Sequence, residues 1–441
     1  MTQKYGSRTR RQLLASSSSV LVGTILAGCS SSKNTGEEGG TTTQNKAVDP
    51  SKLSLKKTGH MLPSGQSSPS GGYSEVDVRT DGTYAVVGTK WGIHGTYLVD
   101  LSDPASPKQA HYMGNSNDAP NLDVKFDHRN GLYYRAIERT WEGNFEIVDY
   151  GYSNGTAKSP QVVGSVSEGK SHNVTPHPTK PVLYTVNYGL KTNGFDVYDV
   201  SNPSSPRKLG QHGPQGACHD ITVDPERELL CSAFQSGKFI GCIMYDVSEP
   251  RSPKEIGRFD YEQQKPYDNA QVGEEAFGRA HHGHFDPRRD LLVLGDERPT
   301  GVPGGKHVFD IGWKDGSPSD PIPVGFTVSP NAKRMSEDYA DRFDWTGHHF
   351  AIVPQGKQTF IVAADWHDGV VVYNITDPTN PHPIDQYSTD DRMKSLTLND
   401  EVSRLGEPPM AWRAAYNPAH DVVVVTDTFT GLYTFELTQS Q

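Results

Sequence analysis

One phrase recurs along this chain, and it constrains the fold more than any other feature. Its four closest copies are TYLVDLSDPASP, FDVYDVSNPSSP, CIMYDVSEPRSP and VVVYNITDPTNP. Each copy is a largely apolar stretch that ends in Asp or Asn, followed by Ser or Thr and then by a spaced pair of prolines. Asp, Asn, Ser and Thr side chains can hydrogen-bond the backbone of a turn, while proline presets φ and removes a donor. Each copy therefore predicts a strand that ends in a tight turn.

These phrases belong to longer units, each of which opens on a further strand. The spacing of about 40–50 residues between copies is typical of propeller blades or similar arrays. The seven opening strands are YSEVDVRTDG, NLDVKFDHRNG, HNVTPHPTKP, HDITVDPERE, HHGHFDPRRD, HHFAIVPQGK and WRAAYNPAHD. The last unit contains only three strands, and the stretch Leu55–Met61 matches the outer strand of the other units. We therefore expect an all-β fold over residues 53–438, a seven-bladed β-propeller of four-stranded blades that an N-terminal strand closes, so that no edge stays open.

The N-terminal residues have the features of an export signal. Residues 9–15, TRRQLLA, contain paired arginines that resemble a twin-arginine signal, and a short apolar run ends in LAGC. That run is too short and too rich in Ser and Gly for a good membrane span. LAGC resembles a lipobox, which predicts that residues 1–29 are a lipoprotein signal peptide and that Cys29 receives a lipid. The alternative is an ordinary signal peptide with an incidental cysteine.

Residues 30–52 are rich in Ser, Thr and Gly and predict a flexible tether. The expected location is outside the cell, with the protein anchored to the outer face of the cell membrane through Cys29. The lipid membrane is therefore one expected partner.

The composition and motifs of the chain exclude several classes of function. Its 42 Lys and Arg against 53 Asp and Glu give a net charge of -11, which argues against nucleic acid as a partner. The sequence has no G-x-S-x-G, H-E-x-x-H, P-loop or dinucleotide fingerprint in a suitable context. Hydrolases and nucleotide-dependent enzymes are therefore disfavoured.

The strand-and-turn phrases also carry a resemblance to a known family. They are similar to the LVIVD-repeat β-propeller proteins, which are often exported lipoproteins of archaea and bacteria, and they extend over most of residues 70–438. The resemblance implies a propeller and a surface location. It implies no particular activity, because one fold supports many functions.

Four histidines occupy the same position in consecutive opening strands, six residues before the proline that ends each strand. They are His172, His219, His281 and His348. The other three strands have Ser74, Leu122 and Trp412 at that position. The first strand of a propeller blade lines the central channel, so four imidazoles are expected to point toward one axis at one face. Neutral imidazole is a good ligand for iron, copper, nickel or zinc. The alternative is that a repeated histidine simply bonds the backbone of the neighbouring blade.

This layout, without any extended sequence motif, resembles two families of metal enzymes. It is similar to the four-histidine iron site of carotenoid cleavage oxygenases and to the propeller of the selenium-binding-protein/methanethiol-oxidase family, a copper enzyme. The resemblance implies iron or copper as a cofactor. The secondary ligand candidates are His282, His284, His349 and Cys218.

Strand alternation is expected to turn His282 and His349 away from the histidine ring. Carboxylates that end second strands could orient the ring imidazoles, and these are Glu138, Asp296, Glu297 and Asp365. Trp366 and His367 are expected to line a pocket at the same face.

Three connections into opening strands are unusually long, and they are Glu262–Ala280, Pro330–Gly347 and Asp390–Met410. Loops of this length in a compact array are usually functional or disordered. They could form a lid beside the histidine ring or remain solvated insertions.

Three further cysteines lie in one segment of the chain. A two-residue turn near Ser236 and Gly237 would place Cys231 directly opposite Cys242, where a cross-strand disulfide is plausible outside the cytosol. The alternative is two small buried hydrophobic side chains. Cys218 would then be unpaired.

Two functions of different classes follow from these features, and whether the chain is an enzyme stays open. The first is a cell-surface binding or scaffold module for another protein or a glycan. The alternative is a metal-dependent oxidase or oxygenase that uses iron or copper at the four histidines. No nucleotide is expected as a partner.

Overall fold

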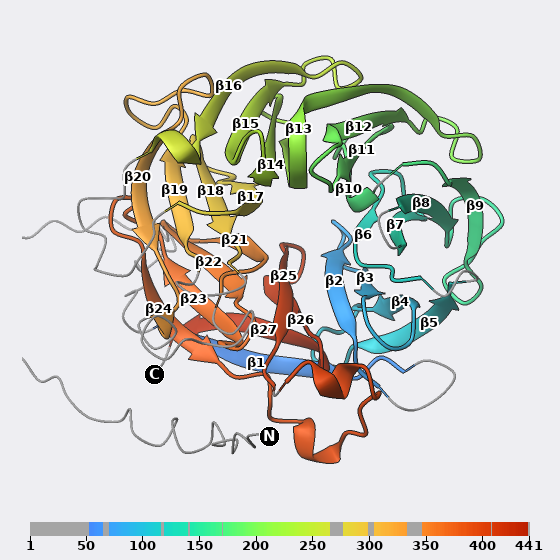
Figure 1. The fold of residues 1–441 in the computed structure, drawn as a ribbon. Helices are drawn as coiled ribbons and strands as arrows, with labels where there is room; N and C mark the ends of the chain where they lie inside the picture. Colours follow the sequence, from blue (N-terminus) through green and yellow to red (C-terminus); the bar gives the residue numbers. More distant parts are fainter. Residues whose placement is uncertain are drawn as a thin grey trace, which may run out of the picture. The chain divides into compact units, whose positions relative to one another are not determined.

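Antiparallel sheets, most of them with four strands, form a ring in the computed structural model (Figure 1). The structure describes residues 53–64, 70–115, 119–139, 142–169, 171–264, 277–298, 304–332, 346–406 and 408–439. The predicted signal peptide, Cys29 and the tether lie outside these residues. Residues 46–441 form one compact unit. Within the described residues, no helix has the length and apolarity that a membrane span requires.

The strands follow one another around the ring in chain order. The first sheet contains β2 (Tyr73–Val78), β3 (Tyr84–Thr89), β4 (Gly95–Asp100) and β5 (Lys108–Gly114). The second contains β6 (Val124–Phe126), β7 (Leu132–Arg139), β8 (Glu142–Asp149) and β9 (Gln161–Val166). A seven-stranded sheet follows, with β10 (Ser171–Pro176), β11 (Val182–Asn187), β12 (Asn193–Asp199), β13 (Arg207–Asp224), β14 (Leu229–Gly237), β15 (Gly241–Asp246) and β16 (Lys254–Asp260).

The remaining three sheets again have four strands each. They contain β17 (Ala280–Phe285), β18 (Leu291–Asp296), β19 (Lys306–Asp310) and β20 (Ile322–Thr327), then β21 (Phe350–Gln355), β22 (Gln358–Ala364), β23 (Val370–Asn374) and β24 (His382–Tyr387). The last sheet contains β25 (Ala411–Asn417), β26 (Val422–Asp427), β27 (Gly431–Gln439) and β1 (Leu53–Met61). Short 3₁₀ helices are η2 (Tyr261–Gln263), η3 (Met393–Ser395) and η4 (Val402–Arg404).

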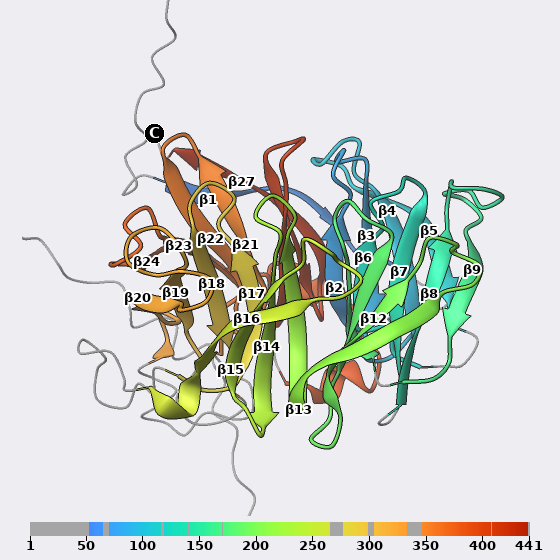
Figure 2. The same ribbon diagram turned by 90° about the horizontal axis from the view of Figure 1, so that it is seen from above.

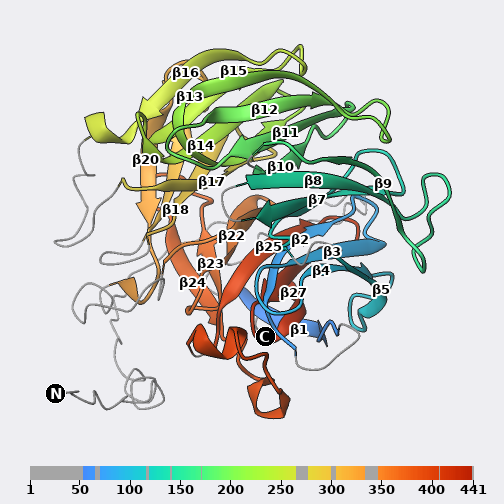
Figure 3. The same cartoon turned by 45° about the vertical axis from the view of Figure 1, so that its right-hand side comes forward.

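Strand β13 serves two four-stranded groups, because its first part pairs with β12 and its second part, from Gly216, pairs with β14 (Figure 2). The described strands therefore fall into four-stranded groups that are consistent with the seven predicted blades. The first strand of each group packs beside the first strand of the next, in the cyclic order β2, β6, β10, β13, β17, β21, β25 and back to β2. We call these seven the inner strands; Figure 1 labels all of them, and Figure 3 shows β2, β10, β17 and β25 from another side.

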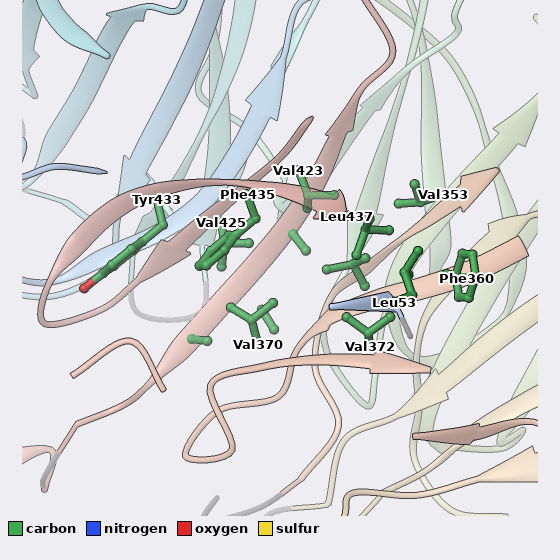
Figure 4. Close-up of a cluster of buried hydrophobic side chains, with 14 residues drawn as sticks. Leu53, Val353, Phe360, Val370, Val372, Val423, Val425, Tyr433, Phe435 and Leu437 are labelled. Atoms are coloured by element: carbon green, nitrogen blue, oxygen red, sulfur yellow. The ribbon is translucent and has the colours of Figure 1, made fainter. Parts of the chain in front are cut away.

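The N-terminal strand closes the ring, as the sequence predicts. β1 pairs antiparallel with β27, and Leu55 lies opposite Leu437. A cluster of buried apolar side chains joins this last sheet to the preceding one, and Leu53, Val372, Val425 and Phe435 are among its members (Figure 4). Burying such side chains between sheets is the main force that holds neighbouring blades together.

The repeated Asp-x-Ser phrase makes the turn that the sequence predicts. Asp100 Oδ1 accepts a hydrogen bond of 2.9 Å from the backbone N–H of Ser102. The equivalent bond recurs from Ser201 to Asp199, from Ser248 to Asp246 and from Thr376 to Asn374.

Glycine in the outer strand lets the next blade's turn approach closely. A Cβ on Gly164 would lie 1.9 Å from the carbonyl oxygen of Pro203, and a Cβ on Gly325 would lie 2.1 Å from that of Pro378. The proline turn of one blade thus packs directly onto the outer strand of its neighbour, which explains why both features recur together.

The predicted cysteine hairpin is wrong in its register. Cys231 lies opposite Met244, and Cys242 lies opposite Ala233, because the connection between β14 and β15 is longer than two residues. Cys231, Cys242 and Cys218 are buried free thiols in this structure, so the predicted disulfide is not formed. A hydrogen bond with Cys242, together with burial, raises the pKa of the Cys231 thiol.

Candidate functional site

Five of the seven inner strands, β2, β10, β13, β17 and β25, have a backbone irregularity at the position where the histidines are in register. In β17 the pairing jumps between Ala280 and His282, so that His281 has no partner on β18. Equivalent register shifts occur between Tyr73 and Val76, Ser171 and Val174, Cys218 and Asp220, and Ala411 and Arg413. A β-bulge inserts an extra residue and redirects the side chains around it. Strict alternation therefore fails at this position.

Two consecutive rings of side chains result from this irregularity. We call the first ring the mouth layer, and it consists of Ser74, Leu122, His172, His219, His281, His348 and Trp412. The residues that follow them form the channel layer, which consists of Glu75, Asp123, Asn173, Asp220, His282, His349 and Arg413. The members of the channel layer are polar, and all but Arg413 are buried.

The prediction that His349 turns away from the ring is wrong. Its ring lies 4.5 Å from that of His348 and 4.7 Å from that of His281, between ring centroids. His282 contacts His349 in turn, with centroids 4.8 Å apart. His349 precedes Phe350, the first residue of β21, so strand alternation does not set the direction of its side chain.

The mouth layer borders a cavity of about 660 Å³ that brings together all four in-register histidines. Aromatic side chains and charged side chains of both signs complete its wall. They are Trp91, Trp366, Trp412, Tyr188, Lys90, Arg279, Arg404, Glu75, Glu138 and Glu297. His349 and the predicted pocket residue His367 also line it.

Hydrogen bonds connect the first two histidines of the ring and set their tautomers. His172 Nδ1 donates to Glu138 Oε1 over 3.0 Å. The Nε2 atoms of His172 and His219 share a hydrogen bond of 3.1 Å. In the tautomer with the proton on Nδ1, His172 accepts at Nε2, and His219 Nε2 is then the donor. The remaining nitrogen of His219, Nδ1, then carries a lone pair.

Glu297 lies between the other two in-register histidines. Its carboxylate oxygens are 3.5 Å from His281 Nε2 and 3.5 Å from His348 Nε2. His348 Nδ1 donates to the carbonyl oxygen of Trp412 over 2.5 Å. Burial raises the pKa of Glu297, although the charge of Lys90 opposes that shift. Glu297 accepts a hydrogen bond from Gln235 over 3.2 Å and lies beside the two imidazoles, so its role as an orienting carboxylate stays a prediction.

Several buried imidazole nitrogens in the two layers have no hydrogen-bond partner. They are His219 Nδ1, both ring nitrogens of His281, His282 Nε2 and His349 Nε2. Burial, followed by the charges of neighbouring groups, lowers the pKa of each of these imidazoles. They are therefore neutral near pH 7, and neutral imidazole is the form that binds metal ions.

The charged side chains of the channel layer, by contrast, pair with one another. Glu75 accepts from Lys125 over 2.8 Å and lies 3.1 Å from Arg413 Nη1. Its second oxygen accepts from His349 Nδ1 over 2.7 Å. Burial acts to raise the pKa of Glu75, but the charges of Arg413 and Lys125 hold it below its ordinary value. Asp220 accepts from His282 Nδ1 over 2.6 Å.

The other residues singled out from the sequence have different surroundings. His284 Nδ1 donates to the carbonyl oxygen of Phe285, and burial lowers its pKa to about 4. Asp296 accepts from His307 and Tyr261 and does not contact the in-register histidines. Asp365 accepts from Lys306 over 2.8 Å and from the backbone N–H of His348 over 3.1 Å, so it positions that histidine's backbone. Burial raises the pKa of the Cys218 thiol well above its ordinary value.

Three groups of side chains among the described residues could hold a metal ion. They are His219, His281 and His349; Asp220, His282 and His349; and His281, Glu297 and His348. One ligand atom from each member lies within 4.8 Å of the others. His172 belongs to none of these groups, so no group contains all four in-register histidines.

The third long connection packs over the cavity. Its residues Val402, Leu405 and Met410 join an apolar cluster with Trp412, and Arg404, Leu405 and Met410 line the cavity wall. Most of the other two long connections lie outside the described residues.

Sequence reasoning missed two features of this site. The first is the channel layer, which the same alignment on proline would have revealed, because every residue after the in-register position is polar. The second is backbone conformation, since the wall residues Arg279 and Trp366 have positive φ angles of 61° and 43°. Such backbone strain in a non-glycine residue clusters at functional sites, and no signal in the sequence marks it.

Comparison with known proteins supports the fold. The model of the LVIVD repeat matches residues 189–211. A similar solved structure is the Cps50 (Swd1) β-propeller domain of Myceliophteria thermophila, with a TM-score of 0.54 and 11% identity over 87% of this chain and 100% of that chain. Another is the C-terminal WD40 domain of Sif2, with a TM-score of 0.48 and 12% identity over 83% of this chain and 81% of that chain. No curated protein matches the sequence. None of these matches supports the oxidase alternative.

Proposed function

Because the chain is a β-propeller that carries an LVIVD repeat, we propose that it is a binding module whose ligand enters the cavity at the mouth layer. The observation that carries this proposal is the cavity itself. Its volume of about 660 Å³ is in the range of small-molecule sites, and its wall combines aromatic faces with a few charged groups.

The wall chemistry favours a sugar unit of a glycan as the ligand. Trp91 and Trp412 meet edge to face with ring centroids 5.4 Å apart, and Lys90 Nζ lies 5.0 Å and 5.1 Å from their ring centroids. An aromatic ring offers a flat apolar face to a sugar ring, while the ammonium and guanidinium groups of Lys90 and Arg279 can donate to hydroxyl or carboxylate oxygens. An acidic sugar would offer an apolar ring face to the tryptophans and a carboxylate to Lys90 and Arg279.

The proposed module is exported and tethered. Cys29 is the proposed lipid attachment site, and residues 30–52 are the proposed tether, as the lipobox and the Ser/Thr-rich composition suggest. In cells that express the full chain, a Cys29→Ser variant is expected to leave the membrane fraction and appear in the medium. Retention of that variant in the membrane fraction would refute the lipid anchor.

Intrinsic tryptophan fluorescence offers a direct test of ligand binding, because three of the six tryptophans line the cavity. The protein is titrated with a panel of neutral and acidic mono- and oligosaccharides. At least one acidic sugar is expected to change the emission saturably, and Trp412→Phe is expected to weaken that binding by about tenfold or more, in line with the energy of a stacked aromatic.

Trp313→Phe is the matched control, because Trp313 does not line the cavity and packs against a cluster between two blades. Its binding is expected to equal that of the unaltered protein. The binding surface would lie elsewhere if two results were obtained together. One is that no sugar of the panel gives a saturable response, and the other is that the protein captures a defined surface protein equally well with and without Trp412→Phe.

A further inference from the structure

We propose that His219, His281 and His349 bind a divalent transition-metal ion of the zinc and copper type. The three imidazoles come from separate inner strands or their leading residues, and one nitrogen of each lies within 4.8 Å of the others. The inference concerns metal binding and goes beyond the proposed ligand cavity, which could bind its ligand without an ion.

The unpartnered nitrogens carry this proposal. His219, His281 and His349 are 6%, 1% and 4% exposed, and each has a ring nitrogen with no hydrogen-bond partner. A buried polar atom without a partner costs about 1–3 kcal/mol, so three such atoms, one on each member of a single group, need a physical explanation. An ion that accepts all three lone pairs supplies one.

Hydrogen bonds on the opposite side of two rings orient these lone pairs. His349 Nδ1 donates to Glu75, which leaves Nε2 as the free nitrogen. His219 Nε2 donates to His172, whose own Nδ1 donates to Glu138, and this leaves His219 Nδ1 free. Ligating histidines in metal sites commonly donate their second ring N–H to a carboxylate, either directly or through another group. His172 is therefore a positioning residue in this proposal and not a ligand.

The other two groups fit an ion less well. In the group of His281, Glu297 and His348, His348 Nδ1 already donates to a backbone carbonyl, and neither His348 nor Glu297 has an unpartnered buried polar atom. In the group with His282, Asp220 already accepts a hydrogen bond from that histidine. Of these three groups, the three-histidine group is the one in which every member has an unpartnered ring nitrogen.

The chemistry of the donors limits the choice of ion. Imidazole nitrogen suits zinc, copper, iron and nickel, whereas magnesium and calcium prefer oxygen ligands. Metal–nitrogen bonds of about 2.0–2.1 Å place the nitrogens of a tetrahedral site about 3.3 Å apart, so binding draws nitrogens at the 4.8 Å limit together by up to about 1.5 Å. The carboxylates of Glu75 and Glu297 lie beside the ligands and offset part of the ion's charge.

Copper(II) is the probe for the test, because its electron paramagnetic resonance spectrum reports nitrogen ligands. The full chain, stripped with a chelator, is titrated with CuSO₄ and separately with ZnCl₂ in competition. We expect the chain to bind one equivalent of Cu²⁺, whose spectrum shows hyperfine structure from nitrogen ligands. Zn²⁺ is expected to displace this Cu²⁺. His281→Gln is expected to weaken binding by more than about 100-fold, and Glu75→Gln, which acts through His349, by about 10- to 100-fold.

His284→Gln is the matched control, because His284 lies on the same strand and its Nδ1 hydrogen-bonds a backbone carbonyl outside the three groups. It is expected to bind Cu²⁺ as tightly as the unaltered chain. Circular dichroism checks that each variant is folded, and His349→Gln replaces His281→Gln if the latter does not fold.

Two results would overturn the proposal. One is the absence of a stoichiometric nitrogen-coordinated Cu²⁺ signal, and the other is an equal loss of affinity in His284→Gln and His281→Gln. The sugar titration of the metal-free protein is independent of both results, so failure of the metal site and failure of the ligand cavity can be told apart.

Discussion

The mouth layer and the channel layer are one residue apart in sequence, yet they differ in how their buried polar side chains are partnered. In the channel layer, Glu75 is paired with Lys125, Arg413 and His349. In the mouth layer, His219 Nδ1 and both ring nitrogens of His281 have no partner and lie beside a cavity. The unpartnered nitrogens of the channel layer, His282 Nε2 and His349 Nε2, belong to rings whose Nδ1 donates to a carboxylate. Unpaired buried polar groups reduce stability, so the mouth layer has the composition of a binding site, whereas the channel layer has that of a structural network.

Removal of the central carboxylate of the channel layer is expected to have the largest effect. Glu75→Gln takes the negative charge away from two cations, Lys125 and Arg413, whose side chains are only 15% and 11% exposed. Breaking a buried ion pair by removing one partner costs about 3–5 kcal/mol. We expect a loss of that size in the free energy of unfolding, measured with urea on the metal-free protein.

The control for this prediction is Glu436→Gln, since Glu436 pairs with Lys56 at 3.5 Å on the surface. Surface substitutions of this kind change stability by no more than about 0.5 kcal/mol. Similar losses in the two variants would contradict the view that the channel layer is a structural network.

Asp123 gives the channel layer a pH dependence of defined sign. Burial raises its pKa to about 7, against the charge of Lys125 and with a contribution from Glu75. Between about pH 4 and about pH 7 the folded state keeps a proton that the unfolded state has released, so stability falls as the pH rises and levels off above about pH 7. The slope from this group is at most about 1.4 kcal/mol per pH unit.

Asp123→Asn is expected to remove this contribution. The free energy of unfolding, measured at several values between about pH 5 and about pH 8, should fall less steeply in the variant. An equal slope in Asp123→Asn and in the unaltered protein would contradict this prediction. It would show that the Asp123 carboxyl of the unaltered protein is ionised over the whole pH range and that the charge of Lys125 offsets the cost of its burial.

Two adjacent histidines in β17 provide the most sensitive comparison of the layers. His281→Leu removes unpartnered nitrogens from the mouth layer and is expected to raise the stability of the metal-free protein by about 1 kcal/mol. His282→Leu leaves Asp220 without its hydrogen-bond donor and is expected to lower it by about 1–3 kcal/mol. Urea denaturation of both variants measures the difference, and a loss of stability in His281→Leu would assign that histidine a structural role.

The local pattern of the chain was enough to predict most of the fold. The Asp-x-Ser-x-Pro phrase encodes its own turn through contacts only two residues apart, such as that from Ser102 to Asp100. The strand that completes the last sheet could be inferred because its outer-strand pattern is repeated elsewhere in the chain, and β1 indeed pairs with β27. The four histidines were likewise found from their common spacing to proline.

Features that depend on backbone irregularity could not be inferred. A hairpin register depends on the length of its turn, and a longer connection displaced Cys231 from Cys242. His349 precedes the first residue of β21, so strand alternation did not decide the orientation of its ring. No residue pattern in a single sequence fixes the first residue of a strand.

The repeat, the turns and the in-register histidines follow from residues close together in one unit, and the closing strand follows from a pattern that the other units repeat, so the amino-acid pattern is enough to predict all four. The grouping of His219, His281 and His349 and the contact of Glu75 with His349 follow from the folded ring alone. Those contacts join side chains from different blades across the centre of the ring, where closure of the ring, rather than any local preference, sets the distances.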